Sequence, residues 1–424
     1  MNYLYFFLLG IALFGLNSCA NTGTPTGGLK DEIPPHLLGT LPVDQSINVK
    51  GRIVELYFDE WIEVKSLKQN LQITPLSENN YKQRKKSIMI IQLEKNIQAA
   101  EYQHLTQKLA SINYQYTKVK TQFQEYLVAI GKQEFDIRSI GVLDGVQDLH
   151  RVSDNYKLVS SKWKVQDTII DLGDGVKIGG GHFSAMAGPC SIEGEEQIEE
   201  TVKHLVKNNV RIMRGGVYKP RSSPYSFRGM GLDGLKLFYK ACQAEGIKII
   251  TEVMQVSQIE GMLDYVDILQ VGARNAQNFN LLDALGKIDK PVMLKRGISG
   301  TIDELLQAAE YVFSNGNEKI LLCERGIRSF ETSYRNTLDL NAVPILKDKS
   351  HLPVIVDPSH GIGVRKYVEQ MSLAGIMAGA DGLIVEVHSQ PEKAFSDGQQ
   401  TLSFAEAEVL YKKIEQTIRL RDSF

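Results

Sequence analysis

The chain has 424 residues, of which 43% are hydrophobic and 23% are charged. This composition is ordinary for a globular protein and argues against a multi-span membrane protein and a disordered chain. The formal net charge of −2 gives no reason to expect a nucleic acid partner, so anion recognition has to come from local clusters of Arg and Lys. The length suits two or three domains. The four cysteines are far apart, without a CxxC pair, which argues against a disulfide scaffold and favours a reducing compartment.

The N-terminus, in contrast, has features of an export signal, which does not agree with a reducing compartment. Residues 4–16 (LYFFLLGIALFGL) form an apolar run too short to span a bilayer as a helix. Residues 1–19 resemble a bacterial lipoprotein signal in which Cys19 is lipidated, although no Lys or Arg precedes Lys30. A functional signal would predict membrane anchoring; a buried N-terminal helix is the alternative.

Residues 20–88 predict a linker and a partial Ig-like fragment. Residues 20–50 are rich in Gly, Pro, Thr and Asn, and residues 52–64 (RIVELYFDEWIEV) alternate as a half-buried strand does. The stretch resembles the start of an envelope lipoprotein with an Ig-like domain. Such a sandwich needs about seven strands, and two or three fit before the basic run at 79–87. We therefore expect an incomplete β-rich N-terminal fragment.

Residues 89–158 predict a small ferredoxin-like domain. MIIQLE reads as a strand, QAAEYQHLTQKLASI as an amphipathic helix, and TKVKTQFQEYLVAIG as one long or two paired strands. DIRSIGVLDGVQDLHRV reads as a second helix with its flanks, and a last strand is expected near Tyr156. This β-α-β-β-α-β order is that of the ferredoxin-like α+β fold. The segment carries no catalytic constellation, so packing or oligomerisation is its simplest role.

Residues 165–424 predict a (β/α)8 TIM barrel, because a short β-branched strand followed by a helical segment recurs eight times. A doubly wound open sheet is the alternative. The expected strands are HFSAMAG, RIMRGG, IKIITEV, VDILQVG, PVMLKRG, KILLCE, LPVIVDP and GLIVEVH.

The active site of such a barrel lies at the C-terminal ends of the strands. Every one of these ends carries a charged or metal-capable residue, and the cations among them predict a pocket for a strongly anionic, phosphate-bearing substrate. In chain order the residues are Cys190, Arg214 with Lys219, Glu252, Arg274, Lys295, Arg325, His360 and Glu386.

Four of the candidates offer sulfur, nitrogen and oxygen ligands: Cys190, His360, Glu386 and, in the loop after the last strand, Asp397. A mixed set of this kind suits a divalent ion such as Mn, Fe, Co or Zn. Alone, each would more often be a buried or surface residue. Their placement on the first, seventh and eighth strand ends, which are neighbours on a closed barrel, favours a metal site. His388 is a possible substitute ligand, and two further cysteines, at 242 and 323, read as packing residues.

The ordered motifs resemble the 3-deoxy-7-phosphoheptulonate (DAHP) synthase family, of the type with an N-terminal ferredoxin-like domain. The resemblance covers residues 89–424 and implies condensation of phosphoenolpyruvate with erythrose 4-phosphate, the first step of the shikimate pathway. The motifs are GPCSIE (188–193), MRGGVYKPRSSPYSF (213–227), GARNAQN (272–278), LKRG (294–297), CERG (323–326), VDPSHGIG (356–363), VEVH (385–388) and SDGQQ (396–400).

The resemblance also implies roles. It makes Cys190, His360, Glu386 and Asp397 the metal ligands, and the metal a Lewis acid for the aldehyde. It assigns Arg214, Lys219 and His360 to catalysis, with Lys219 a candidate for proton transfer. It implies feedback by tyrosine or phenylalanine through residues 89–158, and a homodimer or homotetramer. The implied substrate-binding residues are Arg214, Lys219, Arg221, Ser222, Glu252, Arg274, Lys295 and Arg325.

Two other functions compete. The related 3-deoxy-octulosonate 8-phosphate synthase uses a five-carbon sugar phosphate and has a KANRSS-like sequence where this chain has KPRSS. A non-catalytic envelope lipoprotein would have an eroded site, whereas every expected ligand and cation is present. We expect the enzyme portion to be cytoplasmic, to begin at Met89, and to have been joined to residues 1–88 by gene fusion or a misassigned gene start.

Overall fold

The structure is a computed structural model. It describes residues 37–41, 55–58, 87–131, 136–152, 154–164, 166–220 and 225–424. The chain divides into two units, residues 1–83 and 84–424, and each is described by itself. In the first unit, β1 (Leu37–Leu41) pairs antiparallel with β2 (Glu55–Phe58), which lies inside the strand expected at 52–64. The expected signal segment and the rest of the Ig-like fragment lie outside the described residues.

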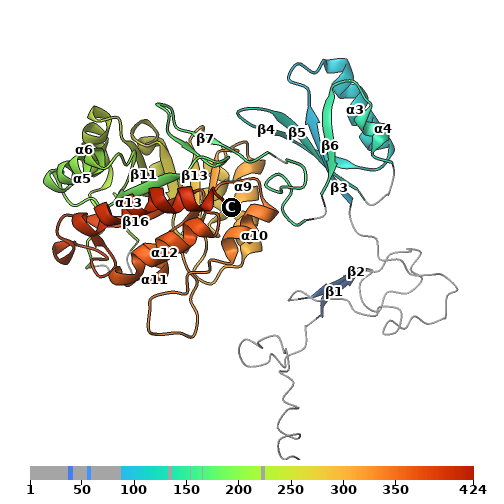
Figure 1. Cartoon of the computed structure of the whole chain (residues 1–424). Helices are drawn as coiled ribbons and strands as arrows, with labels where there is room; N and C mark the ends of the chain where they lie inside the picture. The colour runs from blue at the N-terminus through green and yellow to red at the C-terminus, as the bar shows by residue number, and fades with distance from the viewer. Residues whose placement is uncertain are drawn as a thin grey trace, which may run out of the picture. The chain divides into compact units, whose positions relative to one another are not determined.

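The second unit begins with a four-stranded antiparallel sheet of order β4-β5-β3-β6 (Figure 1). This is the strand order of the ferredoxin-like fold. On β3, Met89, Ile91 and Leu93 alternate onto one face and form a core with Leu105 and Leu109. The elements are β3 (Ser87–Leu93), α3 (Ala99–Ser111), β4 (Gln115–Lys120), β5 (Glu125–Gly131), α4 (Arg138–Gly141) and β6 (Val146–Arg151).

The end of this domain differs from the expectation. The second helix is the single turn α4, and the last strand ends at Arg151 instead of lying near Tyr156. The helix ends at Gly141, and Gly145, with the left-handed φ of +83, belongs to the turn directly before β6. The alternating VQDLHR then pairs with β3. The helix prediction was therefore too long, because it ran over residues that form a strand.

A closed barrel of eight parallel strands follows. Neighbouring strands pair in chain order, and β16 pairs with β9. This closure confirms the predicted (β/α)8 barrel and shows that the doubly wound alternative is wrong. The strands are β9 (Ser184–Gly188), β10 (Ile212–Arg214), β11 (Lys248–Val253), β12 (Ile268–Val271), β13 (Val292–Lys295), β14 (Ile320–Glu324), β15 (Val354–Val356) and β16 (Gly382–His388).

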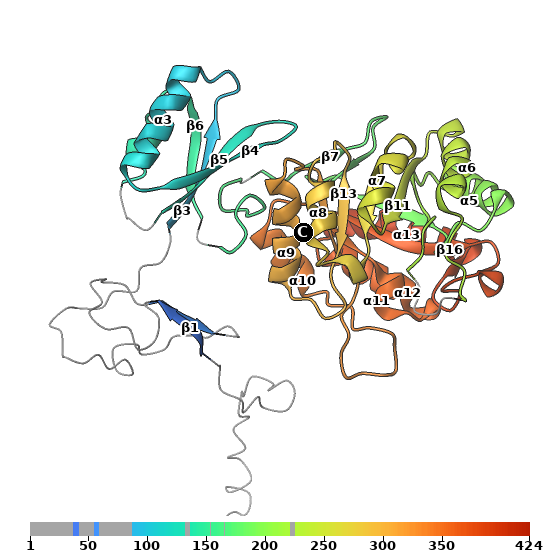
Figure 2. The ribbon, with the colours of Figure 1, turned by 180° about the vertical axis from the view of Figure 1, so that it is seen from behind.

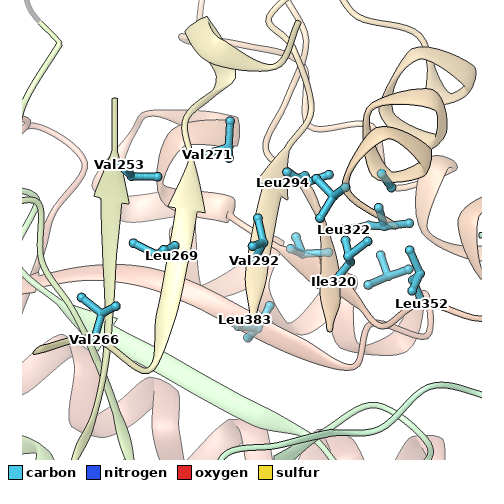
Figure 3. Close-up of a cluster of buried hydrophobic side chains, with 14 of the residues drawn as sticks. Val253, Val266, Leu269, Val271, Val292, Leu294, Ile320, Leu322, Leu352 and Leu383 are labelled. Carbon is cyan, nitrogen blue, oxygen red and sulfur yellow. The ribbon is translucent and has the colours of Figure 1, made fainter. Parts of the chain in front are cut away.

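Helices surround the strands (Figure 2). Strand residues such as Val253, Leu269 and Val292 belong to one buried hydrophobic cluster with residues of these helices; Figure 3 shows part of this cluster. The helices are α5 (Glu195–Lys207), α6 (Gly231–Ala244), α7 (Val256–Met262), α8 (Phe279–Leu285), α9 (Ile302–Ser314), α10 (Ala342–Lys349), α11 (Pro358–Ile362), α12 (Arg365–Met377) and α13 (Phe404–Arg421), with 3-10 turns η1 (Leu263–Tyr265), η2 (Ala273–Asn275) and η3 (Pro391–Lys393) and the short strand β17 (Leu402–Ser403).

A small hairpin that the sequence did not reveal precedes the barrel. It consists of β7 (Ile170–Asp171) and β8 (Lys177–Ile178). Its side chains join the barrel's inner core, which includes Ile212 and Ile268, the first residues of β10 and β12. The hairpin therefore closes the N-terminal end of the barrel and leaves the C-terminal end open for a site.

The ferredoxin-like sheet also packs against the N-terminal end of the barrel. Tyr126 of β5 meets Phe313 at the end of α9, with ring centroids 6.2 Å apart. Gln122 donates to Asn317 Oδ1 at 3.1 Å, just before β14 begins. The domain therefore contacts its barrel at the end opposite the predicted active site. Among the described residues, the structure contains no helix long and apolar enough to cross a membrane.

Candidate active site

A cavity of about 510 Å³ opens at the C-terminal ends of the barrel strands. Its wall is strongly cationic, and most of the polar candidates predicted from the strand ends contribute to it. The lining residues are Arg214, Lys219, Pro220, Ser226, Glu252, Gln270, Gly272, Ala273, Arg274, Lys295, Ile298, Arg325, Arg328, Arg335, Asn336, His360 and Asp397.

Three of the four predicted metal ligands form one cluster. The ligand atoms of Cys190, Glu386 and Asp397 all lie within 4.8 Å of one another. The Cys190 thiol donates to Asp397 Oδ2 at 3.1 Å. Cys190 lies two residues after the end of β9. At this end, Gly188 allows the strand to approach β10 so closely that a Cβ atom would collide with the Arg214 carbonyl oxygen. The backbone thus places the thiol beside two carboxylates.

His360 lies at the edge of this cluster. Its Nε2 atom is 3.4 Å from Glu386 Oε1, and its Nδ1 atom is 2.8 Å from Asp357 Oδ2. Asp357 also caps the short helix α11, because its side chain accepts from His360 N at 3.0 Å. A carboxylate behind a histidine is the usual way to fix the ring that binds a metal. His360 is therefore placed to serve as a fourth metal ligand, with its Nε2 atom toward the cluster.

Buried cations accompany the acidic and sulfur groups. Arg214 donates to Glu386 Oε1 at 2.6 Å, and Lys219 Nζ lies 3.0 Å from Cys190 Sγ. Burial raises the pKa of the Cys190 thiol to about 12, and the Glu386 carboxylate adds to this effect while Lys219 opposes it. Burial also works against ionisation of Glu386, but His360 and Arg214 outweigh it and hold the pKa of that carboxyl below its usual value. The Cys190 thiol would ionise only with additional positive charge beside it, and a divalent ion would supply that charge.

The other predicted substrate-binding residues surround the same cavity. Lys295 and Arg325 are buried, at 4% and 5% exposure, and Arg274 is exposed at the rim. Lys295 Nζ is 2.5 Å from Asp357 Oδ2, and Glu252 of β11 lines the cavity as well. Such an array of guanidinium and ammonium groups binds phosphate and carboxylate. Two predicted residues, Arg221 and Ser222, lie outside the described residues.

The sequence reasoning missed several residues of the site. Arg335 donates to Asp397 Oδ1 at 3.2 Å and to Gln400 Oε1 at 2.8 Å. Gln400 in turn donates to Glu386 Oε2 at 2.8 Å. Gln400 and Asp357 stand inside the motifs SDGQQ and VDPSHGIG, so the motif would have pointed to them. Arg335 lies in the long loop after β14, where no periodicity marks it.

The expectations for His388 and for the cysteines outside the site have different outcomes. His388 is not part of the metal-capable cluster: its Nδ1 atom accepts from Gln390 N at 2.9 Å. The structure therefore gives no support to His388 as a substitute ligand. Cys242 and Cys323 are fully buried and belong to the two hydrophobic cores of the barrel, as expected of packing residues.

Residues 166–422, more than half of the chain, match the sequence profile of the DAHP synthetase I family. The chain belongs to this family. It is 51% identical over 277 residues to the phospho-2-dehydro-3-deoxyheptonate aldolase of Thermotoga maritima, an alignment that covers 65% of this chain and 80% of that protein. The crystal structure of a Thermotoga maritima enzyme of that name, also called DAHP synthase, has a TM-score of 0.62 at 44% identity and covers 79% of this chain and 98% of that chain.

A second group of relatives has another name. The 2-dehydro-3-deoxyphosphooctonate aldolase of a Geobacter species is 33% identical over 263 residues, which cover 57% of this chain and 94% of that protein. The higher identity to the heptonate enzyme favours the family that the motifs predicted and confirms the resemblance.

Proposed function

We propose that this chain is a metal-dependent DAHP synthase that condenses phosphoenolpyruvate with erythrose 4-phosphate and releases inorganic phosphate. The observation that carries this proposal is a single cavity in which five predicted cations meet a cluster of thiol, imidazole and carboxylates. The five cations are Arg214, Lys219, Arg274, Lys295 and Arg325. Two anionic substrates repel one another, and preorganised positive charge in a water-poor site offsets that repulsion.

The metal site fits a divalent ion such as Mn, Fe, Co or Zn, because sulfur and oxygen donors of three residues lie within 4.8 Å of one another and the His360 nitrogen lies at their edge. Cys190, His360, Glu386 and Asp397 would hold the ion, which supplies Lewis acidity at the aldehyde oxygen. Lys219 lines the cavity, and its Nζ atom lies 3.0 Å from Cys190 Sγ. From there its ammonium can donate a proton to an oxygen that gains negative charge in the reaction.

We propose these roles for the anion-binding residues: Arg274, Lys295 and Arg325 hold the phosphate of phosphoenolpyruvate, and Arg214 and Lys219 face its carboxylate. Lys295 and Arg325 are buried on the cavity wall, which strengthens their charge–charge interactions. Arg221 and Ser222 follow Pro220, which lines the cavity, and we propose that they bind the erythrose 4-phosphate phosphate. Glu252 completes the wall.

Phosphate release tests the proposal. The full chain with a divalent ion should release phosphate from phosphoenolpyruvate only when erythrose 4-phosphate is present, and chelation should abolish the release. Lys219→Ala should lower kcat about 100-fold or more. The exposed Lys240 of α6 provides the control, and Lys240→Ala should retain full activity. Phosphate release without an aldose, or full activity of Lys219→Ala, would contradict the proposal.

We further propose that the ferredoxin-like domain (residues 89–158) mediates feedback by tyrosine or phenylalanine, that the enzyme is a homodimer or homotetramer, and that it acts in the cytoplasm. The domain has its own hydrophobic core, and none of its described residues lines the cavity. Its removal should leave turnover intact and eliminate inhibition. An intact enzyme that ignores both amino acids at millimolar concentration would show that the domain is structural.

A further inference from the structure

Asp397, one of the candidate metal ligands, has an unusual backbone. Its φ is +56, in the left-handed region that residues other than glycine seldom adopt. It lies in the connection between β16 and β17, outside any strand or helix of its own. Strained residues of this kind persist where surrounding contacts hold them, and they concentrate at functional sites. Some group must therefore hold this loop.

Glu193, three residues after Cys190, reaches across to that loop. Its Oε1 atom accepts from Phe395 N at 2.8 Å, two residues before Asp397. The same oxygen accepts from Ser191 Oγ at 3.1 Å. The Glu193 side chain is 9% exposed, which limits its contact with water, while Phe395 at the other end of the first hydrogen bond lies at the surface.

The network extends to all three members of the metal-capable cluster. Ser191 follows Cys190 and its hydroxyl lies 2.6 Å from that of Ser396, the residue before Asp397. His388, two residues after Glu386, places Nε2 3.7 Å from Glu193 Oε2. The Glu193 carboxylate thus hydrogen-bonds to the segments that carry Cys190 and Asp397 and lies near the segment that carries Glu386. None of its atoms belongs to the cluster itself.

We infer that Glu193 is a positioning residue of the metal site: it holds the 395–397 loop so that Asp397 faces Cys190 and Glu386. The inference rests on the proposed metal site. Groups behind metal ligands commonly contribute about 10- to 100-fold to affinity. Glu193→Ala should therefore weaken metal binding by about that factor. Glu193→Gln keeps a carbonyl oxygen for Phe395 N and should stay within about threefold of the unmodified chain.

Binding of Co²⁺ to the full chain provides a readout that does not depend on activity. Titration in competition with a chromogenic chelator gives the affinity, and the thiolate-to-cobalt absorption band reports Cys190. Glu196 is exposed on α5 three residues away, and Glu196→Ala should leave the affinity unchanged. A Glu193→Ala affinity within about twofold of the unmodified chain would overturn the inference, since a positioning group should contribute at least tenfold.

A double-mutant cycle separates positioning from a general structural role. If Glu193 acts through Asp397, Glu193→Ala should cost little further affinity in an Asp397→Ala background. A full additional loss in that background would overturn the inference. If Glu193→Ala does not fold, Ser396→Ala removes the hydroxyl contact alone and should weaken Co²⁺ binding severalfold; unchanged binding would overturn it. An unmodified chain that fails to bind Co²⁺ would instead refute the proposed metal site.

Discussion

Protonation of His351 should destabilise the protein as the pH falls. This residue is 1% exposed and joins the connector after the ferredoxin-like domain to the barrel. Its Nε2–H donates to Leu158 O at 2.9 Å, and Nδ1 accepts from the Thr168 hydroxyl at 2.7 Å. Burial, with Lys164 adding to it, lowers the pKa of His351 from 6.5 to about 3. The folded protein therefore holds this imidazole neutral across the acidic range.

The sign follows from proton binding. A lowered folded-state pKa means that the unfolded chain takes up the proton first, so this contribution to stability is complete above pH 6.5 and declines as the pH falls towards about 3. Between about pH 7.5 and about pH 5 the two pKa values give a loss of about 2 kcal/mol. His351→Gln cannot titrate, so its unfolding free energy should change by about 2 kcal/mol less over that interval.

Urea unfolding at both pH values, followed by circular dichroism and by the fluorescence of Trp163, measures this difference. The Trp163 ring lies 5.7 Å from His351 and reports on the same contact. His204, whose pKa burial lowers to about 4, titrates in both proteins and cancels from the comparison. Equal pH dependence of the unmodified protein and His351→Gln would refute the reasoning.

Three further outcomes are expected. Cys190→Ala should lose most metal-dependent turnover while keeping the thermal midpoint of the metal-free protein; full activity in chelator would show that the metal site is misassigned. Phe313→Ala removes a fully buried ring that faces Tyr126. It should lower the unfolding free energy, measured by urea titration, by about 3–5 kcal/mol. A loss below about 1 kcal/mol would contradict the packing described. A chain that begins at Ser87 should match the full chain in kcat and in thermal midpoint, measured by calorimetry. A chain that begins at Met89 loses two residues of β3 and should melt at a lower temperature. A lower midpoint for the chain that begins at Ser87 would mean that residues 1–86 contribute to stability.

The barrel and most of its site could be predicted from the sequence because the order of strands and helices determines which strand ends lie together. Eight β-branched strands alternating with helices leave few arrangements, and a closed parallel barrel brings all strand ends together. Reading Lys295 or Glu386 as site residues therefore required only the position of a strand end. The hairpin β7–β8 could not be found this way, since each strand has two residues and shows no alternation.

Contacts between loops that are far apart along the chain also could not be predicted from the sequence. Arg335 lies 62 residues from Asp397 and meets it only in the folded chain. Asp357 was visible in a motif, and its contact with His360 is local. Its contact with Lys295, however, joins the ends of β13 and β15, which meet only in the folded barrel. The helix expected after residue 136 was too long, because α4 ends at Gly141 and a turn with a left-handed Gly145 leads into six residues that pair with β3.

The preference between two sugar phosphates tests the central claim most directly, since relatives named for the heptonate and for the octonate product both align with this barrel. Initial rates of phosphate release from phosphoenolpyruvate should be measured with erythrose 4-phosphate and with arabinose 5-phosphate, each over a range of concentrations. The account predicts a kcat/KM at least about 100-fold higher for erythrose 4-phosphate, since the polar groups of the site would be matched to one aldose only. An equal or higher value for arabinose 5-phosphate would contradict it.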